Sequence, residues 1–217
     1  TFQEDAAARN IPLNGRGNGT MEHQYGTTTG GNYYPFFGSV ANQMRMQQIF
    51  TPAMVGAEGV IQKIGFNRTT ILDIGTFNNV KISMAHSDLT GPTTTFAANF
   101  NGFLIEVFPT QTVFINSSNM DPWIYFNLNG NFTYDSAHNL LMEIVWNGDS
   151  GNDIALQREV VIGGRVYDTT GAATGAIEDR LTVTRFSVDA VDNGIVDVGT
   201  TTGIFGLFSA GGFYTAC

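Results

Sequence analysis

The sequence predicts an all-β fold, an antiparallel β-sandwich of jelly-roll or Greek-key type with an extended N-terminal arm. Short β-branched and aromatic runs recur along the chain, separated by clusters of Gly, Asn, Asp and Pro. In the run 81–84, and in the second half of the run 182–188, every second residue is apolar, as a half-buried antiparallel strand requires. Apolar residues almost never recur at helical spacing, so the chain has no segments that could form the crossover helices of a parallel α/β fold.

Ten runs are strand candidates in chain order. They lie at 60–66, 79–85, 102–108, 112–115, 123–128, 140–146, 156–162, 165–167, 181–188 and 204–208. Asn-Gly pairs, which tolerate the positive φ of tight turns, begin at Asn14, Asn18, Asn101, Asn129, Asn147 and Asn193. The stretch 42–56 contains helix formers, but Pro52 interrupts it and no helical stripe emerges.

The chain divides by composition into an arm, residues 1–31, and a single sandwich domain, residues 32–217. The Gly- and Thr-rich stretch 27–32 is interpreted as the joint between them. The arm has too few apolar residues for a core of its own. We therefore expect it to lie along the sheet edge of a neighbouring copy.

The amino-acid composition limits the classes of partner that the protein can bind. Charged residues make up 13% of the chain, about half the usual ~25%, and the net charge is −9. The chain therefore lacks the stripe of basic residues that binding to nucleic acids or anionic membranes would need. No apolar run reaches the ~18 residues that span a bilayer.

Export from a bacterial cell is expected from the scarcity of lysine, the abundance of Asn, Thr and Gly, and the single cysteine. A signal peptide is expected to have been removed, or to lie outside this sequence. Cys217 has no partner cysteine in the chain; a free thiol is expected, with pairing between chains as the alternative.

A series of short motifs begins with Tyr34-Pro35-Phe36, QIFTPA at 48–53 and VIQKIGF at 60–66. It continues with FNG at 100–102, WIYFNL at 123–128, FTY at 132–134 and NLLMEI at 139–144. In this order, over residues 34–146, the motifs resemble a jelly-roll-like β-sandwich domain of secreted bacterial surface proteins. The resemblance implies an extracellular module without an assigned activity. Residues 52–54 depart from it, since the family's glutamate is missing there.

One catalytic candidate is the motif GDSG at 148–151, which resembles the nucleophile loop of chymotrypsin-like proteases. Ser150 would need a His base and a buried Asp, for which His86 and Asp121 are the candidates. The chain between His86 and Ser150 is too short for two barrels, and the residues after Gly151 do not match. A turn is therefore predicted, and the protein is not expected to be an enzyme.

Glu106 and Glu143 each lie mid-strand, and two carboxylates about 5–10 Å apart on one sheet could hydrolyse a glycosidic bond. Alternation predicts instead that both are solvent-facing residues of a half-buried sheet. His23, His86 and His138 lack the spacing of a zinc site.

No cofactor is expected, with Ca²⁺ as the alternative. Asp149, Asn152 and Asp153 offer the hard oxygen ligands that Ca²⁺ prefers, without the spacing of an EF-hand loop. A similar acidic turn lies at 189–193. Four glycosylation sequons begin at Asn18, Asn67, Asn116 and Asn131.

The function predicted is that of a non-catalytic extracellular structural or surface protein that binds copies of itself through the arm, as a filament, fibre or surface-layer subunit. The alternative is a carbohydrate-binding or adhesion module, which could depend on Ca²⁺. Such a module would be recognised by two or three coplanar exposed aromatic rings. Aromatic residues cluster at 33–37 and at 123–126, although a sandwich core needs most of them.

Overall fold

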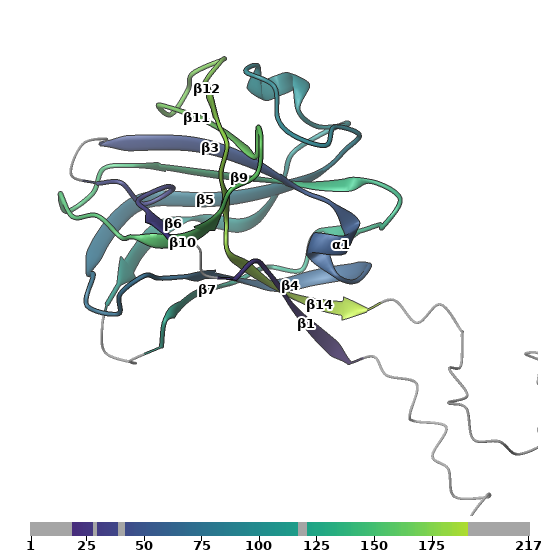
Figure 1. Ribbon diagram of the computed structural model, residues 1–217, viewed down its shortest axis with the longest axis horizontal. Coiled ribbons are helices and arrows are strands. Elements are labelled where there is room, and N and C mark those ends of the chain that lie inside the picture. The colour runs from purple at the N-terminus through teal and green to yellow at the C-terminus, as the bar shows by residue number, and fades with distance from the viewer. Residues whose placement is uncertain (1–18, 28–29, 39–41, 117–120, 191–217) are drawn as a thin grey trace, which may run out of the picture. The chain divides into compact units, whose positions relative to one another are not determined.

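The computed structural model describes residues 19–27, 30–38, 42–116 and 121–190, which form two large sheets packed face to face (Figure 1). All the strand pairs are antiparallel. The predicted fold class, an all-β sandwich, is confirmed.

One large sheet has six strands, in the order β12-β11-β3-β9-β5-β6. Their bounds are Ala176–Glu178 (β12), Arg165–Asp168 (β11), Gln43–Phe50 (β3), Asn139–Asn147 (β9), Gly75–Ser87 (β5) and Ile105–Ile115 (β6). The other has the order β1-β14-β4-β7, and β8 also pairs with β4. Its strands are Thr20–Tyr25 (β1), Thr184–Ala190 (β14), Gly59–Asn67 (β4), Trp123–Asn127 (β7) and Thr133–Tyr134 (β8).

The remaining elements are short. A third sheet has the order β13-β10-β2, formed by Leu181–Thr182 (β13), Leu156–Glu159 (β10) and Gly31–Asn32 (β2). One α-helical turn, α1 (Pro52–Val55), follows β3, and a 3-10 turn, η3 (Phe96–Ala98), precedes β6. In the described ranges, no helix is long and apolar enough to cross a membrane.

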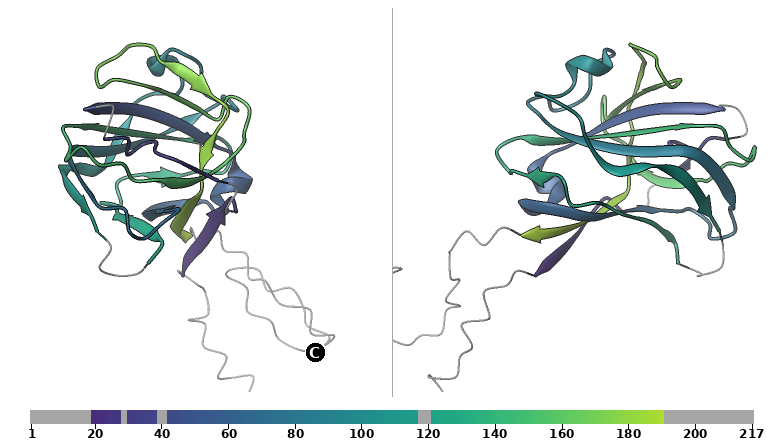
Figure 2. Two further views of the ribbon diagram at one scale, coloured as in Figure 1. Left: turned by 60° about the vertical axis from the view of Figure 1, so that its left-hand side comes forward. Right: turned by 180° about the vertical axis from the view of Figure 1, so that it is seen from behind.

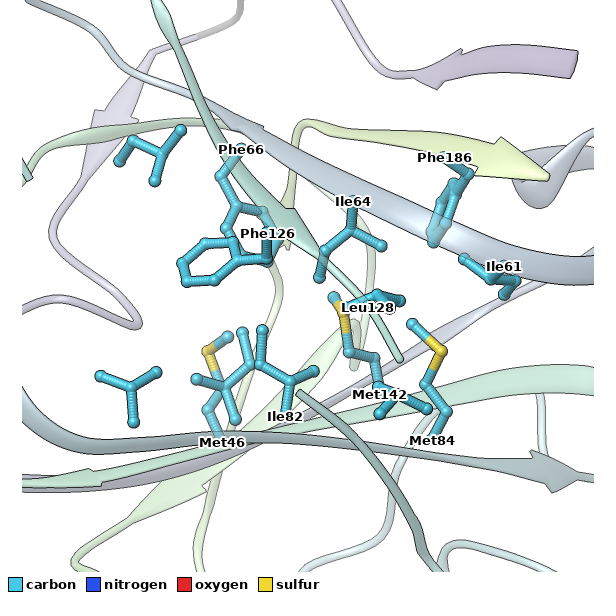
Figure 3. Close-up of a cluster of buried hydrophobic side chains, with 14 of the residues drawn as sticks. Met46, Ile61, Ile64, Phe66, Ile82, Met84, Phe126, Leu128, Met142 and Phe186 are labelled. Atoms are coloured by element: carbon cyan, nitrogen blue, oxygen red, sulfur yellow. The ribbon is translucent and has the colours of Figure 1, made fainter. Parts of the chain in front are cut away.

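The core lies between the two large sheets. Figure 3 shows Ile64, Phe66 and Phe186 facing Met46, Ile82 and Met84 of the opposite sheet. Each of these six side chains is completely buried. Burial of one large apolar side chain contributes about 1.5–3 kcal/mol, so this layer is the main stabilising element of the fold.

The outer faces of the two sheets differ. Over the six-stranded sheet, the η3 loop and the loop that follows β11 join each other, since the Phe96 N–H donates to the Ala173 carbonyl at 3.1 Å. Arg45 of β3 reaches this cover, with its guanidinium 4.4 Å from the Phe96 ring centroid. The outer face of the β1-β14-β4-β7 sheet, seen as a separate layer in Figure 2, carries partly or fully exposed side chains on β1 and β7.

Most strand predictions are confirmed. The predicted strands 102–108 and 112–115 are one strand, β6, which continues through Pro109. Pro109 lies on an edge strand, and the register with β5 shifts at this point, between the pairs Val80–Gln111 and Ile82–Phe108; proline is tolerated at edges and bulges. Gly102, Gly130 and Gly148 have positive φ, as predicted for the Asn-Gly turns. The predicted strand 204–208, Asn14, Asn18, Asn193 and Cys217 lie outside the described residues.

Strand β3 has no counterpart among the sequence predictions. Its residues are buried on both faces, as Gln47 and Gln48 show with no exposed surface. Residues 43–47 (QMRMQ) do alternate polar and apolar, but Met, Gln and Arg are also helix formers, so the sequence did not single out a strand here. The Gln48 side-chain oxygen accepts a hydrogen bond from the Thr182 N–H at 2.7 Å, which stabilises an amide in the core.

Strand β1 differs from the predicted boundary of the arm. Residues 20–25 were assigned to the arm, whereas they pair with β14 along six residues and belong to the sandwich. Tyr25 also packs edge-on against Phe50, with ring centroids 6.2 Å apart. Residues 1–18 lie outside the described residues, so their role remains a prediction.

Candidate functional site

Ser150, His86 and Asp121 do not form a catalytic triad. The Ser150 Oγ accepts a hydrogen bond from the Thr76 N–H at 3.0 Å, near the start of β5. His86 lies near the other end of β5, roughly 30 Å away at the usual rise per residue. No nucleophile–base contact can form over this distance.

Glu106 and Glu143 do share one sheet face, because each is the register partner of Ser83 on β5. The prediction that both face solvent is wrong for Glu143, which is 4% exposed under the loop cover. Its Oε2 accepts hydrogen bonds from Arg45 Nε at 2.8 Å and Gln47 Nε2 at 2.7 Å. Glu143 is therefore a fixed structural anion beside an exposed Glu106, and the two do not flank an open cleft.

The predicted calcium ligands lie on one loop beside the start of β5. Asp149 forms an isolated β-bridge with Phe77, and Asp153 forms one with Phe37. Asn152 is exposed. Among the described residues, no group of three or more His, Cys, Asp or Glu side chains could hold a metal ion. Calcium binding through Asp149, Asn152 and Asp153 remains a prediction.

The sequons fall at surface positions where they are described. Asn116 and Asn131 are exposed, and Asn67 is partly exposed at the end of β4. Asn18 lies outside the described residues. Glycosylation at these positions is untested.

The structure brings together two histidines that sequence spacing did not connect. The rings of His86 and His138 lie 5.5 Å apart, and Asp135 lies between them, with its Oδ1 2.8 Å from His138 Nδ1. The hydrogen bond to Asp135 raises the pKa of His138. This cluster joins the turn between β8 and β9 to the end of β5.

The outer face of the β1-β14-β4-β7 sheet carries the most distinctive group of exposed side chains. Two neighbouring rows of register partners cross the four strands. One row is Gln24, Arg185, Gly65 and Tyr125; the next is Glu22, Ser187, Lys63 and Asn127. Trp123 lies two positions before Tyr125 on β7 and thus faces the same side. We call these residues the aromatic face.

Trp123 and Tyr125 are the two rings of this face. Their planes are 21° apart and their centroids 6.3 Å apart. Tyr125 is 36% exposed and Trp123 partly exposed. The two rings therefore present near-parallel, partly exposed surfaces on the outer face of the sheet.

Cationic groups fix both rings. The Arg185 guanidinium lies 4.1 Å from the Trp123 ring centroid, and its Nη1 donates a hydrogen bond to Tyr125 Oη at 2.8 Å. Lys63 Nζ lies 4.7 Å from the Tyr125 ring centroid. Such cation–π contacts contribute about 0.5–1 kcal/mol at exposed sites, so they orient the rings more than they stabilise the fold.

Glu22 and Gln24 of β1 accept hydrogen bonds from the cationic side chains of the aromatic face. Lys63 Nζ donates to Glu22 Oε1 at 3.0 Å, and Ser187 Oγ donates to the same oxygen at 3.0 Å. The hydrogen bonds from Lys63 and Ser187 lower the pKa of Glu22, which keeps this carboxyl charged. Arg185 Nη2 donates to Gln24 Oε1 at 3.2 Å.

A hollow of about 260 Å³ adjoins the aromatic face where the edges of β6 and β7 meet. It is lined by Arg68, Phe114, Ile115, Asn116, Asp121, Trp123, Ile124 and Tyr125. Phe114 is 64% exposed, so the hollow extends the apolar surface beyond the two rings. The aromatic face and this hollow offer ring faces next to hydrogen-bonding groups.

The sequence located the aromatic clusters but not their orientation. In the cluster 123–126, Phe126 is in the core whereas Trp123 and Tyr125 point outward. Strand alternation alone carries this signal. In the cluster 33–37, Phe36 is fully buried and the exposed Tyr33 stacks on Phe37 at 5.3 Å. The contribution of Arg185 has no signal in the sequence.

Comparisons with known proteins find no matching family model and no matching curated protein. The chain is similar to solved structures of the clostridial cysteine protease Cwp84. One, after propeptide cleavage, has a TM-score of 0.46 and 7% identity, and the match covers 78% of this chain and 40% of that chain. Another, of the cysteine protease and lectin-like domains of this surface-layer-associated protein of Clostridium difficile, has a TM-score of 0.39 and 8% identity, covering 69% and 32%.

The chain thus spans less than half the length of either solved structure. The predicted resemblance to secreted bacterial surface proteins is confirmed only as a β-rich fold.

Proposed function

We propose that this chain is a non-catalytic carbohydrate-binding module of an extracellular surface protein, and that the aromatic face is its binding surface. The observation that supports the proposal is the pair of near-parallel, partly exposed rings of Trp123 and Tyr125. The carbohydrate-binding alternative calls for two or three coplanar exposed rings, and these two partly exposed rings approach that arrangement with planes 21° apart.

The chemistry of the face suits a sugar chain. The C–H faces of a pyranose ring are apolar and pack on aromatic rings, while its hydroxyls need donors and acceptors at the rim. Arg185, Lys63, Gln24 and Glu22 supply both kinds of group next to the rings. Because hydrogen bonds and ring contacts fix these side chains before binding, little conformational entropy is lost when a ligand binds.

Glycan binding to the full chain tests the proposal. Trp123→Ala and Tyr125→Ala should each weaken binding to a retained polysaccharide by about tenfold or more, measured by calorimetry or affinity electrophoresis. Tyr33→Ala, which removes an exposed ring away from this face, is the matched control. An array on which no glycan is retained, or equal effects of all three variants, would contradict the proposal.

Self-association is the second proposed function. The observation in its favour is that β1, the first described strand of the chain, is the last strand of its sheet. Edge strands are common sites of strand addition. The arm itself lies largely outside the described residues.

A further inference from the structure

We infer that the aromatic face selects anionic polysaccharides, whose carboxylate or sulfate groups bind the Arg185 guanidinium beside the rings of Trp123 and Tyr125. This inference rests on the proposed carbohydrate-binding function and narrows its ligand class.

The contacts of Arg185 carry the inference. The guanidinium is held by the Trp123 ring, the Tyr125 hydroxyl and the Gln24 amide, all of which are uncharged. Other arginines of the described chain form ion pairs, such as Arg45 with Glu143 and Arg165 with Glu178. The partners of Arg185 instead fix its direction without neutralising its charge.

Arg185 also has N–H donors left to form hydrogen bonds with a ligand. A guanidinium has five N–H donors, and the two hydrogen bonds to Tyr125 and Gln24 occupy two of them. Arg185 is partly exposed, so the remaining donors can meet a ligand. A planar guanidinium fork matches a carboxylate or sulfate in two parallel hydrogen bonds, and it stays charged at every physiological pH.

Arg185 and Lys63 are the cations of the aromatic face, and Glu22 is its carboxylate. Glu22 accepts hydrogen bonds from Lys63 Nζ and Ser187 Oγ, at 3.0 Å each, and attraction to Arg185 makes a smaller contribution to its lowered pKa. Asp189 lies four positions along β14, roughly 13 Å from Arg185 at the usual rise, and accepts a hydrogen bond from Thr20. That distance exceeds the screening length at physiological salt, about 8 Å.

The location of this cation is informative in an acidic protein. With a net charge of −9, the chain as a whole repels a polyanion. Arg185, stacked on the partly exposed Trp123 ring, places a positive charge next to the surface on which a sugar ring would pack.

Matched polymers separate charge from sugar identity. Polygalacturonate and highly methyl-esterified pectin share a backbone and differ in carboxylate charge, while dextran sulfate and dextran make the same comparison for sulfate. The wild-type full chain should bind at least one anionic polymer about tenfold more tightly than its neutral partner, and this preference should fall as NaCl is raised. Which pair shows the preference distinguishes carboxylate from sulfate.

Variants test the residue. Arg185→Gln should abolish the preference while its melting temperature stays near that of the wild type, and Arg185→Lys, which keeps charge but loses the fork, should retain part of it. Arg180→Gln removes the same charge from a partly exposed arginine paired with Glu178, and should leave the preference unchanged. Trp123→Ala should weaken binding to anionic and neutral polymers alike.

The outcomes are distinguishable. Equal binding to charged and neutral polymers, lost in Trp123→Ala, would overturn the anionic inference and leave the carbohydrate proposal standing. Equal losses in Arg185→Gln and Arg180→Gln would also overturn it, because non-specific charge would then explain the preference. Absence of binding to every polysaccharide would overturn both.

Discussion

At residue 65, β4 carries a glycine directly opposite Tyr125 on β7. A Cβ atom at this position would lie 2.8 Å from Tyr125 Cε1 and 3.2 Å from Trp123 Cε3. Both distances are shorter than van der Waals contact allows. The absence of a side chain at Gly65 therefore lets the two rings lie over the strand.

Gly65→Ala should displace the rings and weaken glycan binding several-fold with little loss of folding, because the clashing atoms belong to partly exposed side chains. Calorimetry, with the near-ultraviolet circular dichroism of Trp123, measures both effects. Gly19→Ala is the control, since its Cβ would meet nothing within 4 Å. Unchanged binding in Gly65→Ala would show that the ring positions do not matter.

Substitutions of the two mid-strand glutamates, Glu143 and Glu106, should differ in their effect on stability. Glu143→Leu removes the partner of Arg45 and Gln47 beneath the loop cover and should lower the free energy of unfolding by about 2–3 kcal/mol. Glu106→Gln changes an exposed side chain and should stay within about 0.5 kcal/mol. Urea unfolding measures both values, and similar small losses would mean that the buried pair is not important to stability.

At the scale of elements, competing propensities explain why β3 was not predicted. Residues 43–47 alternate polar and apolar, as a strand does, but Met, Gln and Arg are also good helix formers. On β14 the β-branched and aromatic residues favour a strand, and the outward Arg185 and inward Phe186 follow each other. The outer face of β3 lies under two loops that come from distant parts of the sequence. No local sequence pattern indicates that these loops cover the strand.

The turn between β8 and β9 should respond to pH. The hydrogen bond to Asp135 raises the pKa of His138 above its ordinary value of 6.5, so the folded state favours the imidazolium. The resulting stabilisation is fully present below pH 6.5 and is lost as pH rises through the raised pKa.

NMR titration of the His138 ring checks this prediction. Asp135→Asn should lower the pKa of His138, and Asp88→Asn should lower it less, because its Oδ1 is 3.7 Å from His138 Nε2. If the pKa of His138 did not move in Asp135→Asn, the cluster would not couple the turn to β5.

At the scale of the molecule, the sandwich depends on β1 and not only on residues after 31. Removal of residues 1–18 should leave cooperative unfolding intact. Removal of residues 1–26 should lower the free energy of unfolding, because β14 loses its six-residue partner and Phe50 loses Tyr25. Urea denaturation compares the two truncations.

The same truncations test self-association. Sedimentation of the 1–18 truncation should show loss of oligomers if the arm connects copies of the chain. Oligomers that persist after this removal would assign the contact to the sandwich itself.

The sequence by itself determined the fold class, most of the strands and the Asn-Gly turns, because period-two alternation and positive-φ residues are local properties. It also located Trp123 and Tyr125 on one strand. The tertiary structure alone decided which faces are covered, burying Glu143 and leaving Tyr125 exposed. It also decided that Arg185 meets Tyr125, 60 positions away, and Gln24, 161 away, because strand order in a sheet depends on pairing between segments distant in the chain.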